Sequence, residues 1–128
     1  MRRAALVLVA CATAAPPPRV LQVNRPGENV GIARAVVPGY VTVVDFWSAD
    51  CQACTQVAAQ VEPALAAEPR VVIRRVDVGD GVTPVARAYE ITALPHYNVY
   101  DRRGHLRHVL VGSDCLQAPA LAHALASE

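Results

Sequence analysis

The stretch that decides the fold of this chain is Val41-Thr42-Val43-Val44-Asp45-Phe46-Trp47-Ser48-Ala49-Asp50-Cys51-Gln52-Ala53-Cys54. Residues 41–47 are almost all apolar and rich in β-branched side chains, which predicts a strand that is covered on both faces. A short connector then leads to two cysteines. The residues that follow Cys54 are rich in Ala, Gln and Val, which predicts a helix. The order is therefore strand, turn and helix, with Cys51 at the helix N-terminus.

This position favours redox chemistry at the two cysteines. The unpaired N–H groups and the dipole of a helix N-terminus stabilise a negative charge, so a thiolate there is a ready nucleophile. Cys54 follows one helical turn later, close enough to form a disulfide with Cys51. A Cys-x-x-Cys pair also occurs in zinc sites. However, His105 and His108 are predicted to lie on opposite faces of one strand, which disfavours a metal site shared by them. We expect no metal and no cofactor, because a redox-active cysteine pair itself carries the electrons.

At these residues the chain resembles the thioredoxin family. The resemblance rests on Val44-Asp45-Phe46-Trp47, on the Cys-x-x-Cys pair and on Ile91-Thr92-Ala93-Leu94-Pro95, about forty residues further on. It extends from about Val20 to the C-terminus. It implies an α/β, thioredoxin-like fold, in which helices flank both faces of a central mixed β-sheet. It also implies a thiol–disulfide oxidoreductase that reduces protein disulfides by cycling between dithiol and disulfide.

The resemblance assigns roles to individual residues. It makes Cys51 the nucleophile, Cys54 the resolving cysteine and Asp45 the proton acceptor and donor of Cys54. Asp45 ends a strand that is covered on both faces, and burial of a carboxyl group raises its pKa towards neutrality. A cis Pro95 is expected to face the cysteines. The groove that binds an extended substrate is expected to contain Trp47, Leu94, Pro95 and Gly112.

Several positions depart from the usual family pattern. They are Asp50 in place of Trp, Gln52-Ala53 in place of Gly-Pro, Thr55 in place of a basic residue, Ala59 in place of Pro, and Arg75 in place of Lys. Such changes beside the cysteines leave the redox potential open. They also motivate an alternative function, in which the chain is a non-catalytic thioredoxin-like module for protein binding or assembly on the cell envelope.

The N-terminal residues predict export and lipidation. Arg2 and Arg3 precede the apolar run 4–10, which has the order and minimum length of a signal peptide. Leu8-Val9-Ala10-Cys11 resembles the lipobox of bacterial lipoproteins, which implies that Cys11 is lipidated. We expect a lipid-anchored protein of the cell envelope that faces the periplasm or another extracytoplasmic space. An apolar extension with an incidental cysteine is the alternative.

The predicted organisation has three parts: a lipoprotein signal peptide at 1–10, the lipidated Cys11 and a Pro-rich tether at 11–18, and a thioredoxin-like domain at 19–128. The formal net charge of +1 gives no indication of a nucleic-acid partner. We expect a monomer that acts on protein disulfides or dithiols and exchanges electrons with a thiol-transfer protein in the membrane. Cys115 is left without a pairing partner and is predicted to be buried or to cap a helix; a regulatory or dimer-forming thiol is the alternative.

The remaining segments predict an alternation of strands and helices. Strands are expected at 20–23, 40–47, 70–78, 96–101 and 105–111, and helices at 28–37, 51–67, 83–89 and from about 119 to 127. This order fits a mixed sheet with helices on both faces.

Overall fold

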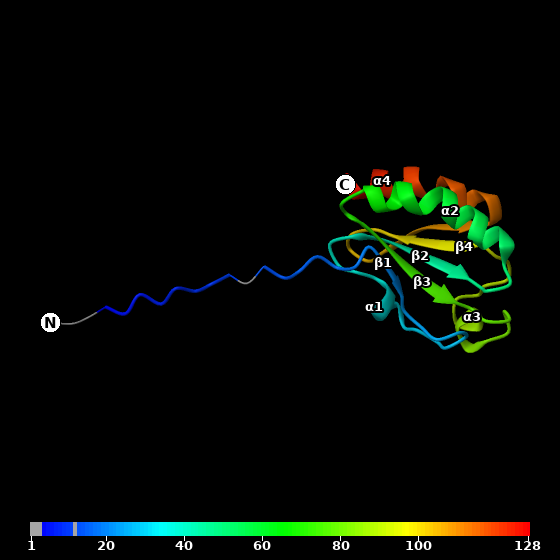
Figure 1. Cartoon of the computed structure of the whole chain (residues 1–128), viewed down its shortest axis with the longest axis horizontal. Helices are drawn as coiled ribbons and strands as arrows, with labels where there is room; N and C mark the ends of the chain where they lie inside the picture. The colour runs from blue at the N-terminus through cyan, green and yellow to red at the C-terminus, as the bar shows by residue number, and fades with distance from the viewer. Residues whose placement is uncertain (1–3, 12) are drawn as a thin grey trace.

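The computed structural model describes residues 4–11 and 13–128. Arg2 and Arg3 of the predicted signal peptide and Ala12 of the predicted tether lie outside the described residues. The described part of the chain before Pro18 contains no helix or strand and extends away from the rest of the molecule (Figure 1). Across the described residues, every helix is too short or too polar to cross a membrane.

The domain contains five strands, four α-helices and one 3₁₀ helix. In chain order they are β1 (Val20–Gln22), α1 (Ile32–Ala35), β2 (Val41–Trp47), α2 (Gln52–Ala67), β3 (Val71–Asp77), α3 (Pro84–Ala88), β4 (His96–Tyr100), β5 (Leu106–Val111), the 3₁₀ helix η1 (Gly112–Gln117) and α4 (Ala118–Ala126).

The strands form one mixed sheet in the order β1-β3-β2-β4-β5. β3 pairs in parallel with both β1 and β2, whereas β4 pairs antiparallel with β2 and with β5. Helices α2 and α4 cover one face of the sheet, and α1 and α3 lie on the other (Figure 1). The predicted fold class is confirmed.

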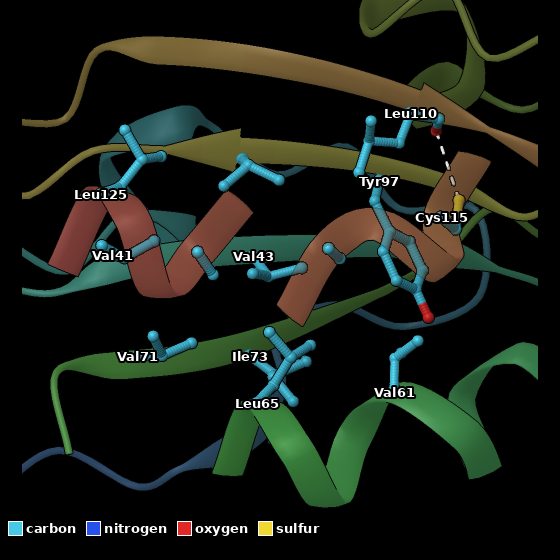
Figure 2. Close-up of a cluster of buried hydrophobic side chains, with 13 residues drawn as sticks. Val41, Val43, Val61, Leu65, Val71, Ile73, Tyr97, Leu110, Cys115 and Leu125 are labelled. Carbon is cyan, nitrogen blue, oxygen red and sulfur yellow. Dashed lines mark hydrogen bonds between the residues drawn. The ribbon is translucent and has the colours of Figure 1, made fainter. Parts of the chain in front are cut away.

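Each face of the sheet has its own hydrophobic core, because successive residues of a strand point to opposite faces. Figure 2 shows the core on the α2 and α4 side, where Val41 and Val43 of β2 meet Leu65 of α2 and Leu125 of α4. The core on the other side contains Val44, Phe46, Val76, Val85 and Tyr100. The central strand β2 is thus buried on both faces, as its apolar sequence predicted.

The predicted helix at 28–37 is much shorter in the structure and spans only Ile32–Ala35. It begins after Gly31, whose backbone is extended, and it ends because Val36 is extended as well. Val36 is β-branched and Val37 precedes Pro38, a position that disfavours helical backbone. The prediction gave the local propensity of the segment too much weight.

The N-terminal end of α3 agrees with the prediction to within one residue, since Thr83 is its N-cap residue and Pro84 its first residue. The Thr83 hydroxyl donates to the carbonyl oxygen of Val78 at 2.7 Å and makes no capping hydrogen bond. The C-terminal helix is preceded by η1, which was not predicted. Helix α2 is continuous through Pro63, in agreement with the single helix predicted at 51–67.

Candidate active site

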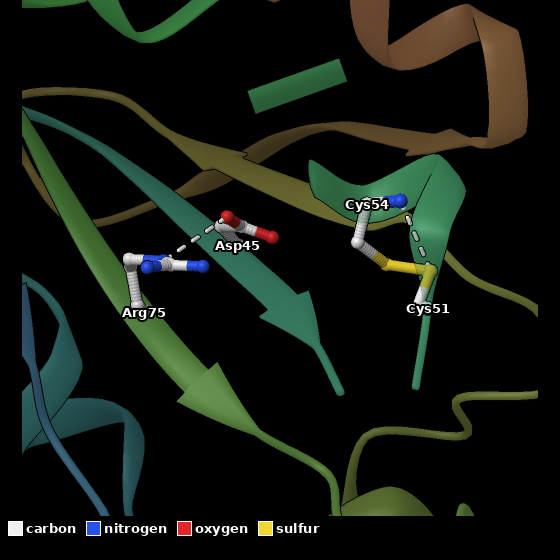
Figure 3. The surroundings of a disulfide bond; sticks show 4 residues. All are labelled: Asp45, Cys51, Cys54 and Arg75. Atoms are coloured by element: carbon white, nitrogen blue, oxygen red, sulfur yellow. Dashed lines mark hydrogen bonds and ion pairs between the residues drawn. A yellow bond between two sulfur atoms is a disulfide. The ribbon is translucent and has the colours of Figure 1, made fainter. Parts of the chain in front are cut away.

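Cys51 and Cys54 form a disulfide at the N-terminal end of α2 (Figure 3). Their Cα atoms are 5.2 Å apart. Cys51 is the N-cap residue, and its Sγ accepts a hydrogen bond of 3.0 Å from the backbone N–H of Cys54. Cys54 is buried and Cys51 is half-buried, so Cys51 presents the more accessible sulfur. This arrangement suits a nucleophilic Cys51, because N–H groups at a helix N-terminus stabilise a thiolate.

Asp45 lies in the surroundings of the disulfide and is almost completely buried (Figure 3). It sits in the central strand β2, opposite Arg75 of β3 and Tyr97 of β4. In Figure 3 its carboxyl group lies between the Arg75 guanidinium and the cysteines. Burial raises the pKa of Asp45 from 3.8 to about 7; the positive charge of Arg75 opposes this rise and the negative charge of Glu62 adds to it. A carboxyl group with this pKa can both accept and donate a proton near neutrality.

Arg75 is the cation beside Asp45, and it contacts three side chains. Its Nε lies 3.6 Å from Asp45 Oδ2 and 3.9 Å from Glu62 Oε1. Its Cζ lies 4.4 Å from the centroid of the Trp47 ring, in a cation–π contact. Trp47 is held in turn by a hydrogen bond of 3.1 Å from its Nε1 to Gln22 Oε1. The structure therefore places Trp47 against Arg75, as a packing residue at the edge of the site.

Sequence reasoning identified Arg75 but missed Glu62. A signal was present in the sequence: Glu62 lies four residues after Ala58 and three before Leu65, both of which belong to the buried face of α2. A carboxylate at the border of an apolar helix face needs a partner or access to solvent. In this protein the Glu62 carboxylate lies near the Arg75 guanidinium group, and 31% of the Glu62 side chain is exposed.

Leu94, Pro95 and Gly112 come together at one edge of the sheet. The Leu94–Pro95 peptide bond is cis, and the carbonyl oxygen of Pro95 accepts a hydrogen bond of 2.9 Å from the N–H of Gly112. His96 pairs with Phe46 in the β2–β4 register. Pro95 therefore lies at the same edge of the sheet as Trp47 and the connector to Cys51.

The other two cysteines lie away from the disulfide. Cys115 is fully buried, and its Sγ donates to the carbonyl oxygen of Leu110 at 3.4 Å. Burial raises the pKa of its thiol to about 12, so Cys115 is the buried residue that the sequence predicted. Cys11 is exposed in the extended N-terminal segment. The described residues include no group of three or more His, Cys, Asp or Glu side chains that could hold a metal ion.

These features define a class of protein. A strand–turn–helix that carries a Cys-x-x-Cys disulfide at its helix N-terminus, within a mixed sheet of this topology, is typical of thiol–disulfide oxidoreductases. The family follows from the sequence comparison, because the thioredoxin family model matches residues 34–125. The chain belongs to the thioredoxin family and is a thiol–disulfide oxidoreductase. No curated protein sequence matches it significantly.

Solved thioredoxin structures resemble this fold. Oxidised thioredoxin from Plasmodium falciparum is 27% identical, with a TM-score of 0.55, and the match covers 69% of this chain and 83% of that one. Thioredoxin from Fasciola hepatica is 24% identical, with a TM-score of 0.57 and the same coverage of 69% and 83%. Oxidised thioredoxin O1 from Arabidopsis thaliana is 22% identical, with a TM-score of 0.61, and the match covers 73% of this chain and 85% of that one.

Proposed function

We propose that this protein is a membrane-tethered reductase of protein disulfides. The observation that carries the proposal is the Cys51–Cys54 disulfide at the N-terminus of α2, with the buried Asp45 in its surroundings. The cysteine pair carries two electrons, so the cycle requires no organic cofactor or metal.

The reaction proceeds by two thiol–disulfide exchanges. The Cys51 thiolate attacks one sulfur of a substrate disulfide; a mixed disulfide forms, and the other substrate sulfur leaves as a thiolate that takes up a proton. The Cys54 thiolate then attacks Cys51 Sγ, which breaks the mixed disulfide and releases the second substrate thiol. The substrate gains two electrons, and the chain is left with the disulfide that the structure contains.

Asp45 supplies proton transfer in the second exchange. Cys54 is buried and must lose its proton before it can attack, and a carboxylate nearby is a suitable acceptor. A pKa of about 7 lets Asp45 take that proton and release it again without a strong base or acid. In the reverse direction Asp45 returns the proton to Cys54.

The substrate binds at the edge of the sheet that carries the cysteines. Four residues line this site in our proposal: Trp47, Leu94, Pro95 and Gly112. Pro95 and Gly112 are joined by a hydrogen bond, and Leu94 is half-buried beside them. An extended substrate strand that passes here would bring its disulfide to Cys51.

The tether places the enzyme in the cell envelope, anchored by lipid on Cys11 and facing the periplasm or another extracytoplasmic space. Support comes from the exposed Cys11 and from the exposed apolar side chains of residues 6–9 just before it. A reductase in this compartment needs an electron source, and a thiol-transfer protein of the same membrane would return Cys51 and Cys54 to the dithiol form. The enzyme acts as a monomer in this proposal.

The catalytic part of the proposal is tested with two single-cysteine variants of the whole chain. The Cys54→Ser variant should accumulate a mixed disulfide between Cys51 and disulfide-bonded insulin, because the resolving thiol is missing. Cys51→Ser should accumulate none and should lose insulin reduction. Mass spectrometry of the trapped adduct identifies the cysteine involved. Equal trapping by both variants would refute the assignment of Cys51 as the sole nucleophile. A wild type that does not reduce insulin, with no adduct trapped by either variant, would indicate the non-catalytic binding module.

The anchoring part is tested separately in a bacterial host supplied with labelled palmitate. The wild type should incorporate label and sediment with membranes, whereas Cys11→Ser should do neither. Cys115→Ser serves as the matched control, since it also removes one unpaired cysteine. Label in the Cys11→Ser protein would refute lipidation at this position while leaving the redox chemistry unaffected.

A further inference from the structure

Glu62 is a second carboxylate at the redox site. It belongs to α2, the helix that begins at the cysteines, and its Oε1 is buried and lies 3.9 Å from Arg75 Nε. Asp45 Oδ2 lies 3.6 Å from the same nitrogen. One guanidinium group therefore faces two carboxylates, one from β2 and one from α2.

The Nε of Arg75 forms no hydrogen bond with either carboxylate. Both distances exceed those of a hydrogen bond, and Nε has no hydrogen-bond partner among the described residues. The guanidinium group also lies over the Trp47 ring, with Cζ 4.4 Å from the ring centroid. A bidentate pair with Asp45, which is the strongest way for Arg to stabilise an ionised carboxylate, is not formed.

We propose that Glu62 is a positioning residue of the redox site, because it shares the Arg75 guanidinium with Asp45 and thereby leaves Asp45 free to bind and release the proton of Cys54. This inference rests on the proposed function of Asp45 as the proton acceptor. Glu62 acts through charge: it offsets the positive charge of Arg75, which lowers the pKa of Asp45 and so favours its ionised form.

The remaining titratable groups around Asp45 do not substitute for Glu62. Tyr97 of β4 and Cys115 of η1 both face Asp45, and burial raises the pKa of each, so both are neutral at neutral pH. Cys51 and Cys54 carry no charge while they are joined in the disulfide. Among the described residues, Arg75 and Glu62 are thus the charged side chains that decide how firmly Asp45 holds its proton.

The inference is tested by titrating Asp45 in the oxidised protein, where neither active-site cysteine titrates. The side-chain carboxyl carbon of Asp45 is followed by NMR from pH 4 to pH 10 in the wild type and in Glu62→Gln. The substitution removes a negative charge and leaves Arg75 unopposed. The midpoint of the Asp45 titration should therefore fall, by at least about half a pH unit.

Glu68→Gln is the matched control. Glu68 caps the C-terminal end of the same helix and contacts His123, so the substitution makes the same change in net charge away from Arg75. Its Asp45 midpoint should stay at the wild-type value. An unchanged midpoint in Glu62→Gln, or an equal fall in Glu68→Gln, would overturn the inference. Glu62→Ala provides a second variant and should lower the midpoint as Glu62→Gln does, because both lack the charge.

The pH dependence of insulin reduction separates this inference from the proposed function. If the Asp45 midpoint and the pH profile both move down in Glu62→Gln, Glu62 positions a working proton acceptor. If the NMR midpoint moves while the pH profile does not, the charge coupling to Asp45 is upheld and the role of Asp45 in the exchange is refuted. If the NMR midpoint does not move, the inference about Glu62 fails whatever the activity.

Discussion

Asp45 and Arg75 lie opposite each other in the parallel register of β2 and β3, with Oδ2 and Nε 3.6 Å apart. A cation at this distance favours an ionised Asp45, yet the pKa of Asp45 is raised to about 7, because burial outweighs the attraction of Arg75 and Glu62 adds repulsion. Desolvation of a buried charge often exceeds the gain from one partner. The protein therefore keeps a carboxyl group that changes its charge near neutral pH beside a redox-active disulfide.

The raised pKa of Asp45 predicts that folding stability falls as the pH rises. The folded protein holds the Asp45 proton up to about pH 7, whereas the unfolded chain releases it near its ordinary value of 3.8. The free energy of unfolding should therefore decrease between these values and level off above about pH 8. Asp45→Asn cannot ionise, so its stability relative to the wild type should increase by roughly 3 kcal/mol between pH 5 and pH 8.

Urea denaturation of the oxidised proteins at the two pH values measures this difference. Asp50→Asn is a suitable control, because it changes an exposed aspartate in the connector. A pH dependence that is the same in Asp45→Asn and in the wild type would contradict the assignment of this titration to Asp45.

Arg75→Gln should move the Asp45 titration in the direction opposite to Glu62→Gln. The cation lowers the pKa of Asp45, so its removal should raise the midpoint above the wild-type value of about 7. The variant also loses the contact with Trp47, which is the sole tryptophan of the chain, so its fluorescence should change as well. We expect the loss of the cation–π contact to lower the unfolding free energy by about 0.5–1 kcal/mol. A lower Asp45 midpoint in Arg75→Gln would show that Arg75 does not stabilise the carboxylate.

Cys115 should be unreactive towards iodoacetamide in the reduced, folded protein. Its thiol is fully buried and burial raises its pKa to about 12, so almost no thiolate is present at pH 8. In a Cys11→Ser background, peptide mapping should find rapid alkylation at Cys51 and alkylation of Cys115 only after urea is added. Alkylation of Cys115 at the same rate in folded and unfolded protein would mean that the thiol is accessible, and would revive the regulatory alternative.

Arg74 is expected to stabilise the attachment of the edge strand β1 to β3. This arginine is almost completely buried, and its Nη1 donates to the carbonyl oxygens of Pro18 and Ile73, each at 2.9 Å. Arg74→Met removes the bond to Pro18, so β1 should separate from the edge of β3 more often. Hydrogen exchange at the Val23 amide, which donates to Arg75 O, should become about tenfold faster, which corresponds to a loss of about 1.4 kcal/mol.

Arg70→Met provides the comparison, because Arg70 is an exposed arginine just before the same strand. It should leave exchange at Val23 unchanged, and neither variant should alter the amides of the central strand β2. Equal exchange at Val23 in Arg74→Met and the wild type would show that β1 is held by its strand pairing alone.

Much of the fold could be predicted from local patterns in the sequence. The apolar run of residues 41–47 predicted the central strand, since a strand buried on both faces shows no polar alternation. The two cysteines, with a helix-forming stretch after them, predicted a redox site at a helix N-terminus. The helix predicted at 28–37 was wrong at both ends, because extended backbone at Gly31 and Val36 confines the helix to four residues.

The sequence by itself determined the strand–turn–helix, the position of the cysteine pair at the helix N-terminus and the burial of Asp45, because each depends on residues close together along the chain. Only the tertiary structure decided which charges surround Asp45. The β2–β3 register sets Arg75 opposite Asp45, and the packing of α2 against this face brings in Glu62 from a third element. The proton affinity of a buried carboxyl group depends on distances of a few ångströms to such charges, and these distances exist only once the elements have packed.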